Sequence, residues 1–341
     1  MKAIQSKVKP LIWQENKLFV LDQRLLPHEK KYLELTNYKE VIEAIRNMTL
    51  RGAPLIGITA AYGMVLAAQE FGVKKLKDIA EEIKQSRPTA INLKWAIDLI
   101  MNDVSSVDVI TKRAIWIHED DAMRCQKIGE HGAKTVETLH ATSLLTICNT
   151  GALATGGIGT AFGVILTAHE KDQNIKVFAA ETRPRQQGAR LTTFEFVENG
   201  IDCTLISDTA CGYLMQKGEI DLVVAGADRI AANGDTANKI GTYQLAVLAK
   251  ENNIPFYIAA PLSTFDLSCT SGEDIPIEER HSEEVTNING KPICGDGVKV
   301  RNPAFDVTQA KYISGIITEK GILKENYVDE IKNIFNQVMI A

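Results

Sequence analysis

The chain of 341 residues has a hydrophobic fraction of 45%, a charged fraction of 24% and a formal net charge of −5. These values are typical of an ordinary globular protein and argue against a general nucleic-acid-binding protein, which usually presents a basic face. Two domains are expected, because single domains usually contain about 100–200 residues.

The N-terminal stretch MKAIQSKVKPLIWQ has neither the apolar core nor the small-residue cleavage site of a signal peptide. No apolar run in the sequence reaches the roughly 18 residues of a membrane span. The six cysteines form neither a CxxC pair nor a disulfide framework: Cys125, Cys148, Cys203, Cys211, Cys269 and Cys294. We therefore expect a cytoplasmic protein with reduced thiols, without a metal site and without membrane or nucleic-acid partners.

The first part of the chain predicts a small sheet followed by helices. The segments LIWQ and KLFVLD flank a short turn at Glu15–Asn16, a pattern typical of a hairpin. From Tyr38 onward, apolar residues recur every three or four positions. This spacing predicts helices at residues 41–48, 53–69, 76–86, 92–104 and about 107–136. Residues 1–140 are therefore predicted to form a mostly helical domain with a small sheet at its start.

The second part of the chain alternates between strands and helices. Short apolar runs ending in small or polar residues predict strands: SLLTIC, IKVFAAE, CTLIS, IDLVVAG and PFYIAA. Their nearly continuous hydrophobicity is typical of parallel strands that are covered on both faces. Residues 141–341 are therefore predicted to form a Rossmann-like α/β domain with a doubly wound parallel sheet.

Ligands of such sheets collect outside the carboxyl ends of the strands. The residues at these ends are read directly from the sequence: Cys148, Glu181, Asp208, Asp228 and Pro261. A thiol and three carboxylates would thus lie along one edge of the sheet. This edge is the first candidate site.

Cys148 is followed by a turn with four glycines in nine residues, within CNTGALATGGIG. Backbone N–H groups and a helix start after a strand favour a reactive thiol. A buried cysteine that acts as a small apolar residue is the alternative. The glycine-rich turn favours the functional interpretation, because the backbone there must bend sharply or approach a ligand. It does not match the GxGxxG turn of a dehydrogenase.

Asp228 follows five apolar residues and begins a dense polar segment, GADRIAANGDTANKIG. A carboxyl group at the mouth of a dry pocket can serve as a general acid or base. An Asx turn or a helix N-cap explains the same residue equally well. The spacing alone leaves both interpretations open.

Two arginines precede helix starts, and a third segment is rich in arginine. Arg51 begins RGAPLIG, and Arg87 lies in SRPTAINLKW; each suits either an anion site or a plain helix cap. The segment ETRPRQQGARLT, around Gln186–Gln187, is either a solvated loop or a site for a phosphorylated polyol.

Ordered segments from Arg51 to Gly321 resemble the methylthioribose-1-phosphate isomerases of methionine salvage. They are RGAPLIG, SRPTAINLKWAID, CNTGALAT, ETRPRQQGARLT, GADRIAANGDTANKIGTYQLA, IPIEER, NPAFDVT and IITEKG. The resemblance implies an aldose–ketose isomerase that converts 5-methylthioribose 1-phosphate to 5-methylthioribulose 1-phosphate, without a cofactor, in a homodimer. The spacer GGIGTA after CNTGALAT departs from the family pattern and bears on the shape of the pocket.

The resemblance also implies the site residues. Cys148 and Asp228 match the family's catalytic pair. The substrate-binding positions carry over to Arg51, Gly52, Ala53, Arg87, Gln187, Asn238 and Lys239. The same superfamily contains ribose-1,5-bisphosphate isomerases and non-catalytic regulatory subunits of a translation initiation exchange factor. Isomerisation of 5-deoxyribose 1-phosphate or ribose 1,5-bisphosphate, or a non-catalytic regulatory role, are therefore the alternatives.

Overall fold

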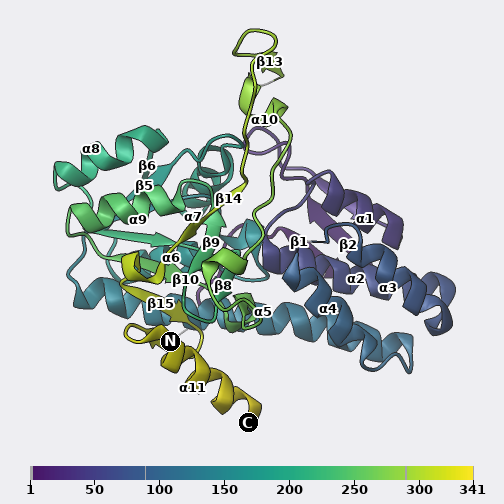
Figure 1. Ribbon diagram of the computed structural model, residues 1–341. Coiled ribbons are helices and arrows are strands. Elements are labelled where there is room, and N and C mark those ends of the chain that lie inside the picture. Colours follow the sequence, from purple (N-terminus) through teal and green to yellow (C-terminus); the bar gives the residue numbers. More distant parts are fainter. Residues whose placement is uncertain (1–2, 89, 289, 341) are drawn as a thin grey trace.

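The computed structural model describes residues 3–88, 90–288 and 290–340 and shows a helical layer beside a large twisted sheet (Figure 1). The chain begins with an antiparallel sheet of β1 (Leu11–Gln14), β2 (Lys17–Leu21) and β3 (Tyr32–Leu35). The predicted hairpin is confirmed, because β1 and β2 pair around Glu15 and Asn16, whose φ angles are 52° and 59°. Such positive angles are those that a tight two-residue hairpin turn requires. The sequence pattern did not predict β3.

Five helices follow in the described part of the chain, as predicted: α1 (Tyr38–Arg46), α2 (Ala53–Phe71), α3 (Leu76–Lys84), α4 (Ile91–Met101) and α5 (Val107–Thr138). Side-chain caps fix two of the starts, since Asn37 accepts hydrogen bonds from the backbone N–H groups at the start of α1 and Ser106 caps α5.

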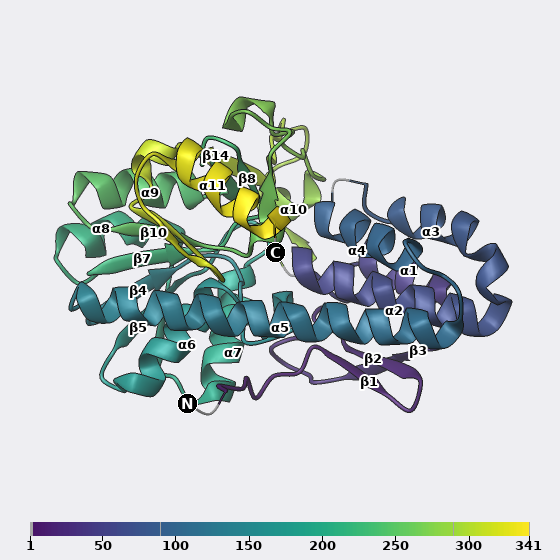
Figure 2. The same ribbon diagram turned by 90° about the horizontal axis from the view of Figure 1, so that it is seen from below.

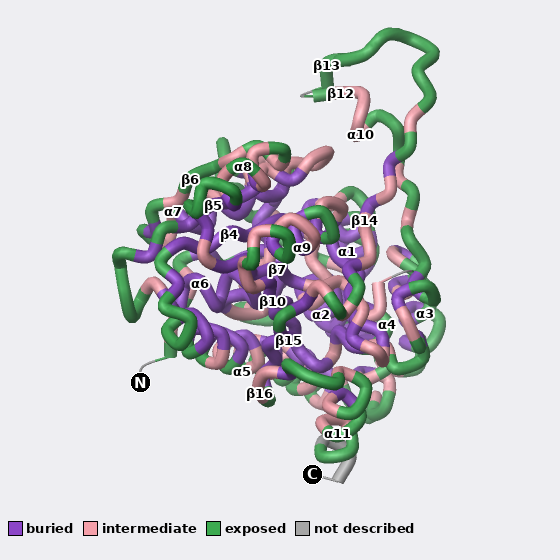
Figure 3. The backbone as a smooth tube through the Cα atoms, turned by 60° about the vertical axis from the view of Figure 1, so that its left-hand side comes forward, coloured by how far each residue is buried: buried purple, intermediate pink, exposed green. Residues whose placement is uncertain are grey.

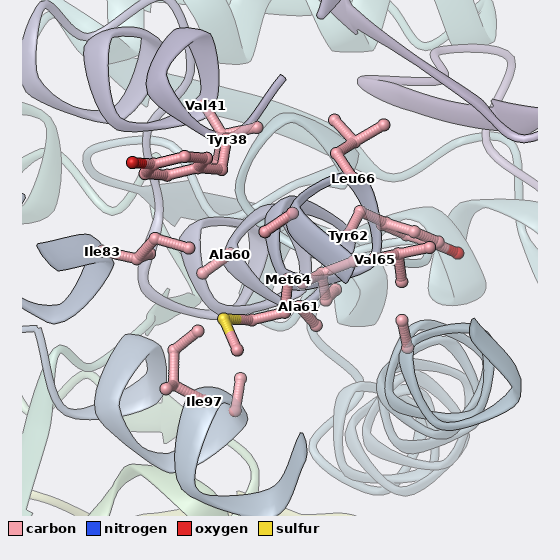
Figure 4. Close-up of a cluster of buried hydrophobic side chains, with 14 of the residues drawn as sticks. Tyr38, Val41, Ala60, Ala61, Tyr62, Met64, Val65, Leu66, Ile83 and Ile97 are labelled. Atoms are coloured by element: carbon pink, nitrogen blue, oxygen red, sulfur yellow. The ribbon is translucent and has the colours of Figure 1, made fainter. Parts of the chain in front are cut away.

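Helix α2 is apolar on every side and lies at the centre of this helical layer (Figure 1 and Figure 2). It packs against α1, α3, α4 and α5, so no face of it is left for water. Its side chains Tyr62, Met64 and Leu66 point in different directions into the surrounding cluster, as Figure 4 shows. The surrounding core therefore fixes the position of α2 and of its N-terminus.

The seven strands of the large sheet lie in the order β16-β15-β10-β7-β4-β5-β6 within the described residues. Their bounds are β4 (Ser143–Thr146), β5 (Lys176–Ala180), β6 (Cys203–Ile206), β7 (Leu222–Ala225), β10 (Phe256–Ala259), β15 (Gly315–Thr318) and β16 (Gly321–Leu323). The five predicted strands are confirmed and are parallel. The sequence pattern did not predict β15 or the antiparallel β16. This is the strand order of a Rossmann-like sheet.

Helices cover both faces of the large sheet, so the predicted doubly wound fold is confirmed. Their bounds are α6 (Ala161–Lys171), α7 (Thr193–Asn199), α8 (Cys211–Gln216), α9 (Thr242–Glu251) and α11 (Tyr327–Ile340). Successive residues of one strand serve opposite cores: Leu144 packs with α5, α6 and α7, and Leu145 packs with α8 and α9. This alternation explains why each strand reads as continuously apolar.

A second, smaller sheet lies beyond the carboxyl ends of the large one. It contains β8 (Arg229–Ala231), β9 (Thr236–Lys239), β11 (Phe265–Asp266) and β14 (Phe305–Thr308). The polar segment after Asp228 is therefore a hairpin of β8 and β9, and Asp228 does not cap a helix. Residues 281–288 and 290–299 form a projecting arm that is mostly exposed (Figure 3). It contains α10 (Glu283–Thr286), β12 (Asn287–Ile288) and β13 (Lys291–Pro292).

Helix α5 runs across the whole molecule, as Figure 2 shows, and packs on α2 at one end and on α6 and β15 at the other. The predicted domain boundary at residues 140/141 falls in the connection between α5 and β4. The division into two domains stays a prediction, because α5 contributes to the cores on both sides of that connection. None of the helices in the described ranges is long and apolar enough to cross a membrane.

Asp121 ties α5 to the glycine-rich loop that follows Cys148. Its carboxylate lies almost completely out of water and accepts a hydrogen bond of 2.6 Å from the backbone N–H of Gly156. Burial raises the pKa of Asp121 to about 6, although the Gly156 N–H opposes the shift. The folded state therefore favours the protonated carboxyl group.

The stability of the fold should depend on Asp121 in a defined pH window. Its contribution is fully present below the unfolded pKa of 3.8 and is lost as the pH rises through about 6. Wild type should therefore lose up to about 3 kcal/mol relative to Asp121→Asn between pH 4 and pH 7. Urea unfolding of both proteins across this range measures the difference. A difference that does not change with pH would contradict the assignment.

Candidate active site

A cavity of about 200 Å³ lies at the carboxyl edge of the large sheet, between the start of α2 and the small sheet. Eight of the nine residues implied by the resemblance line it: Arg51, Gly52, Ala53, Arg87, Cys148, Gln187, Asp228 and Lys239. Asn238 is not among the lining residues. Its buried side chain donates a hydrogen bond of 2.9 Å to Thr242 Oγ1 at the start of α9 instead. Neighbouring residues of β9 face opposite sides, which separates Asn238 from Lys239.

The topology explains why Cys148 and Asp228 meet. Cys148 lies two residues beyond β4, and Asp228 lies three residues beyond β7. These strands are adjacent and parallel, and the strand order reverses between them, with β5 on one side and β10 on the other. A crevice forms at such a switch point, because the connections leave in opposite directions.

Cys148 sits in a strained turn that its neighbours hold in place. Its φ angle is 63°, which is uncommon for a residue other than glycine. The backbone N–H of Cys148 donates to Thr182 Oγ1 at 2.9 Å, and Thr192 Oγ1 donates to the Cys148 carbonyl at 2.5 Å. The helix expected directly after the turn begins only at Ala161, after a 3₁₀ turn, η2 (Ala152–Ala154). Strain of this kind collects at functional sites.

The side chains of Cys148 and Asp228 remain available to a ligand. The backbone N–H of Asp228 donates to the Ala237 carbonyl at 2.9 Å and anchors the residue to β9. Neither its carboxylate nor the Cys148 thiol hydrogen-bonds to any residue that the structure describes. The pair therefore faces the cavity without a protein partner.

One wall of the cavity has the features that favour an anion. Gly52 caps the N-terminus of α2, where free backbone N–H groups and the helix dipole favour a negative charge. Arg51 and Arg87 also line the cavity, and the charge of Arg51 acts on Arg87. The Arg87 guanidinium makes no hydrogen bond to the described residues, and burial lowers its pKa, with Arg280 contributing through its charge. An anionic ligand would relieve this crowding of cations.

Lys239 approaches the cavity from β9. Its buried ammonium group donates to the Ala304 carbonyl at 2.9 Å and lies 4.3 Å from the centre of the Phe305 ring. Burial lowers the pKa of Lys239, while the charges of Cys148 and Asp228 oppose the shift. A buried cation of this kind is stabilised by a bound anion.

Several lining residues were not predicted from the sequence. Arg280 and Glu278 come from the segment before the projecting arm, and Gln23 comes from the loop after β2. Among the described residues, eight cationic side chains line the cavity against two acidic ones. The cavity thus contains more cations than the three predicted site residues Arg51, Arg87 and Lys239. The IPIEER stretch carried a signal for Arg280, because it belongs to the segments of the resemblance.

Two predicted strand-end carboxylates do not reach the cavity. Asp208, beyond the edge strand β6, accepts hydrogen bonds from the backbone N–H groups of Thr182 and Arg183 at 2.8 and 2.7 Å. It shapes the loop that carries Arg185 and Gln187 towards the cavity. Glu181 also lies outside the lining. The switch point, and not the whole sheet edge, therefore defines the site.

Comparisons with known proteins agree on one family. The model of the "Initiation factor 2 subunit family" matches residues 49–325. A methylthioribose-1-phosphate isomerase of Geotalea uraniireducens (strain Rf4) is 53% identical over 336 residues, which cover 94% of this chain and 96% of that protein.

Solved structures of relatives have the same fold. That of a 5-methylthioribose 1-phosphate isomerase from Pyrococcus horikoshii OT3 is 40% identical, with a TM-score of 0.91 and 97% of each chain covered. That of a translation initiation factor eIF-2B, subunit delta, from A. fulgidus is 39% identical, with a TM-score of 0.86 and 96% and 100% covered. This chain therefore belongs to the initiation factor 2 subunit family and, within it, to the methylthioribose-1-phosphate isomerases.

Proposed function

We propose that this chain isomerises 5-methylthioribose 1-phosphate to 5-methylthioribulose 1-phosphate, with Cys148 and Asp228 as its acid/base pair. The observation that carries the proposal is the position of these two side chains at the switch point, facing one cavity with an anion site. The names of the relatives supply the substrate and the place in methionine salvage.

The chemistry requires groups of this kind. The anomeric oxygen of an aldose 1-phosphate is phosphorylated, so the ring opens only when the bond between C1 and the ring oxygen breaks. A hydrogen must then move from C2 to C1. In the proposed mechanism Asp228 donates a proton to the ring oxygen as the bond from that oxygen to C1 breaks. Cys148 removes the proton from C2, which gives an enediol-type intermediate, and delivers a proton to C1. The proton of the C2 hydroxyl returns to Asp228 as the carbonyl at C2 forms. The alternative is a direct hydride shift, with the pair handling only oxygen-bound protons.

The substrate phosphate would lie at the start of α2. The backbone N–H groups after Gly52 and the guanidinium groups of Arg51 and Arg87 supply charge-assisted hydrogen bonds, which fix the sugar against the acid/base pair. Gln187 would bind a sugar hydroxyl, because its Oε1 is buried and has no hydrogen-bond partner among the described residues. The role of Asn238 in binding would be indirect, through Thr242.

Gln23 is a further residue that suits a sugar hydroxyl. Its Nε2 donates to the Leu153 carbonyl at 2.8 Å, which fixes the orientation of the amide. Its Oε1 is buried, without a partner, in a residue that lines the cavity. A buried acceptor left unpaired costs about 1–3 kcal/mol, and a hydroxyl donor from the ligand would remove that cost.

The proposal is tested by following ketose formation from 5-methylthioribose 1-phosphate, with 5-deoxyribose 1-phosphate and ribose 1,5-bisphosphate as parallel substrates. Turnover of the first with the highest kcat/KM is the expected result. Preference for the bisphosphate would assign the surplus cations to a second phosphate. Failure of all three would favour a non-catalytic subunit.

The fate of the transferred hydrogen distinguishes the two mechanisms. Deuterium from heavy water should enter C1 of the product if the hydrogen moves as a proton through an enediol. Retention of the C2 hydrogen would assign a hydride shift. We also propose that the protein works in the cytoplasm as a homodimer, as the resemblance implies. Sedimentation of the purified protein tests its oligomeric state.

A further inference from the structure

Glu195 is a buried acid that the proposed mechanism does not use. It lies on α7, has no exposed surface, and points at the turn after Cys148. Its Oε2 accepts a hydrogen bond of 2.6 Å from Asn149 Nδ2, and its Oε1 accepts one of 3.0 Å from the backbone N–H of Leu153. Burial raises the pKa of Glu195 to about 7, while these two donors and Arg51 oppose the shift.

The orientation of Asn149 is fixed by its second partner. Arg51 Nη1 donates to Asn149 Oδ1 at 2.5 Å, and both terminal nitrogens of Arg51 donate to the Asn149 carbonyl at 3.0 Å. An arginine has no acceptor, so the Asn149 oxygen must face Arg51 and its amide nitrogen must face Glu195. The hydrogen bonds therefore run in one direction from Arg51 through Asn149 to Glu195.

The same network reaches the thiol turn. Asn149 Nδ2 also lies 3.2 Å from Thr192 Oγ1, and that hydroxyl donates to the Cys148 carbonyl. Gly151 lacks a side chain where Glu195 approaches: a Cβ there would lie 2.3 Å from Glu195 Oε2. The local backbone is thus shaped around this carboxylate.

We propose that Glu195 is a positioning residue that locks the phosphate-binding Arg51 and the Cys148 turn into one rigid unit through Asn149. The proposal rests on the proposed function, since it concerns the geometry of the same reaction. Both oxygens of Glu195 accept from N–H donors, those of Asn149 and Leu153. A glutamine at this position would therefore bring its own N–H groups against one of these donors. Arg51 and the Cys148 turn would then no longer be held at a fixed distance from each other. Both phosphate binding and proton transfer would be weakened.

Reversing the polarity of the Asn149–Glu195 pair tests the inference. Glu195→Gln places an amide nitrogen against a donor, and Asn149→Asp places two carboxylates against each other. Each single variant should lower kcat/KM by about 10²-fold, with KM raised and kcat lowered together. In the double variant the introduced amide donates to the introduced carboxylate, which still accepts from Arg51. We expect recovery of at least tenfold over either single variant. A double variant no better than the singles would overturn the proposal.

Glu319→Gln is the matched control. Glu319 is a buried carboxylate that accepts from the backbone N–H of Leu262 and lies outside the cavity lining. This variant should lose stability but keep the wild-type KM. A residue needed only for folding would behave in the same way, so an unchanged KM in folded Glu195→Gln protein would also overturn the proposal.

Thr192 carries the test if the Glu195 and Asn149 variants do not fold. Thr192→Val removes the hydroxyl that holds the Cys148 carbonyl and keeps the shape, whereas Thr192→Ser keeps the hydroxyl. We expect kcat to fall at least tenfold in the first and to be restored in the second; equal kcat in both would overturn the coupling. Wild type that does not turn over any of the three sugar phosphates would instead refute the proposed function.

Discussion

Asp228→Asn and Cys148→Ser should each lower kcat by about 10²–10⁴-fold, the usual contribution of a positioned acid or base. Both substitutions nearly keep the shape of the side chain, and neither side chain hydrogen-bonds to a described residue, so the fold should be preserved. KM should change little, because the phosphate is held by other groups. Initial rates over a range of 5-methylthioribose 1-phosphate concentrations measure both constants.

Exposed residues of the same types provide matched controls. Cys294 and Asp296 lie on the projecting arm, away from the cavity. Cys294→Ser and Asp296→Asn should keep wild-type kcat and KM. If either cavity variant keeps more than a tenth of the wild-type kcat, that residue does not take part in proton transfer.

Gly52→Ala should have the largest effect on the structure at the start of α2, where we propose that the substrate phosphate binds. The φ angle of Gly52 is 102°, and an added Cβ would lie 2.4 Å from Ala154 Cα and 2.7 Å from the Ala154 carbonyl oxygen. These contacts are with backbone, so relief requires movement of α2 away from the turn after Cys148. Overpacking of this kind costs about 1–3 kcal/mol, and the unfavourable backbone conformation adds about 1–3 kcal/mol. The free energy of unfolding, measured with urea, and kcat/KM should both fall.

Gly72→Ala separates the collision from the backbone strain. Gly72 ends the same helix with a φ angle of 71°, but an added Cβ would meet nothing within 4 Å. This variant should lose less stability and should keep its kcat/KM. If the two variants lose equal stability and both keep activity, the close packing of Gly52 on Ala154 has no part in the site.

Local sequence patterns were sufficient for most of the fold. Helix periodicity predicted α1 to α5, and continuous apolar runs predicted five parallel strands, because these signals depend on residues close in the chain. Failures occurred where long-range pairing decides the structure. The hairpin after Asp228 resembled a cap or a turn locally, yet it pairs with β11 and β14 from a distant part of the chain.

The residue types of the candidate site were also apparent from the sequence, but their spatial relationship was not. Cys148, Glu181, Asp208 and Asp228 all follow strands, so position after a strand does not distinguish the four; only the resemblance singles out Cys148 and Asp228. Strand order decides among them, since only β4 and β7 flank the switch point. Asn238 and Lys239 are neighbours in the sequence, which does not tell which of them reaches the cavity. In the structure Lys239 lines the cavity, whereas Asn238 lies on the opposite side of β9 and contacts α9.

The sequence by itself determined the five helices α1 to α5, five strands of the large sheet and the Rossmann-like class, because periodicity is a property of neighbouring residues. Its ordered motifs also gave the resemblance that implies the Cys148–Asp228 pair. Only the tertiary structure decided which strand ends meet, how cationic the cavity is, and that Glu195 stands behind the Cys148 turn. These features arise from contacts between segments far apart in the chain, such as Asn149 with Glu195, 46 positions apart, and Arg24 with Arg190, 166 positions apart. Burial and hydrogen-bond direction, which give Glu195 its proposed role, exist only once those segments pack together.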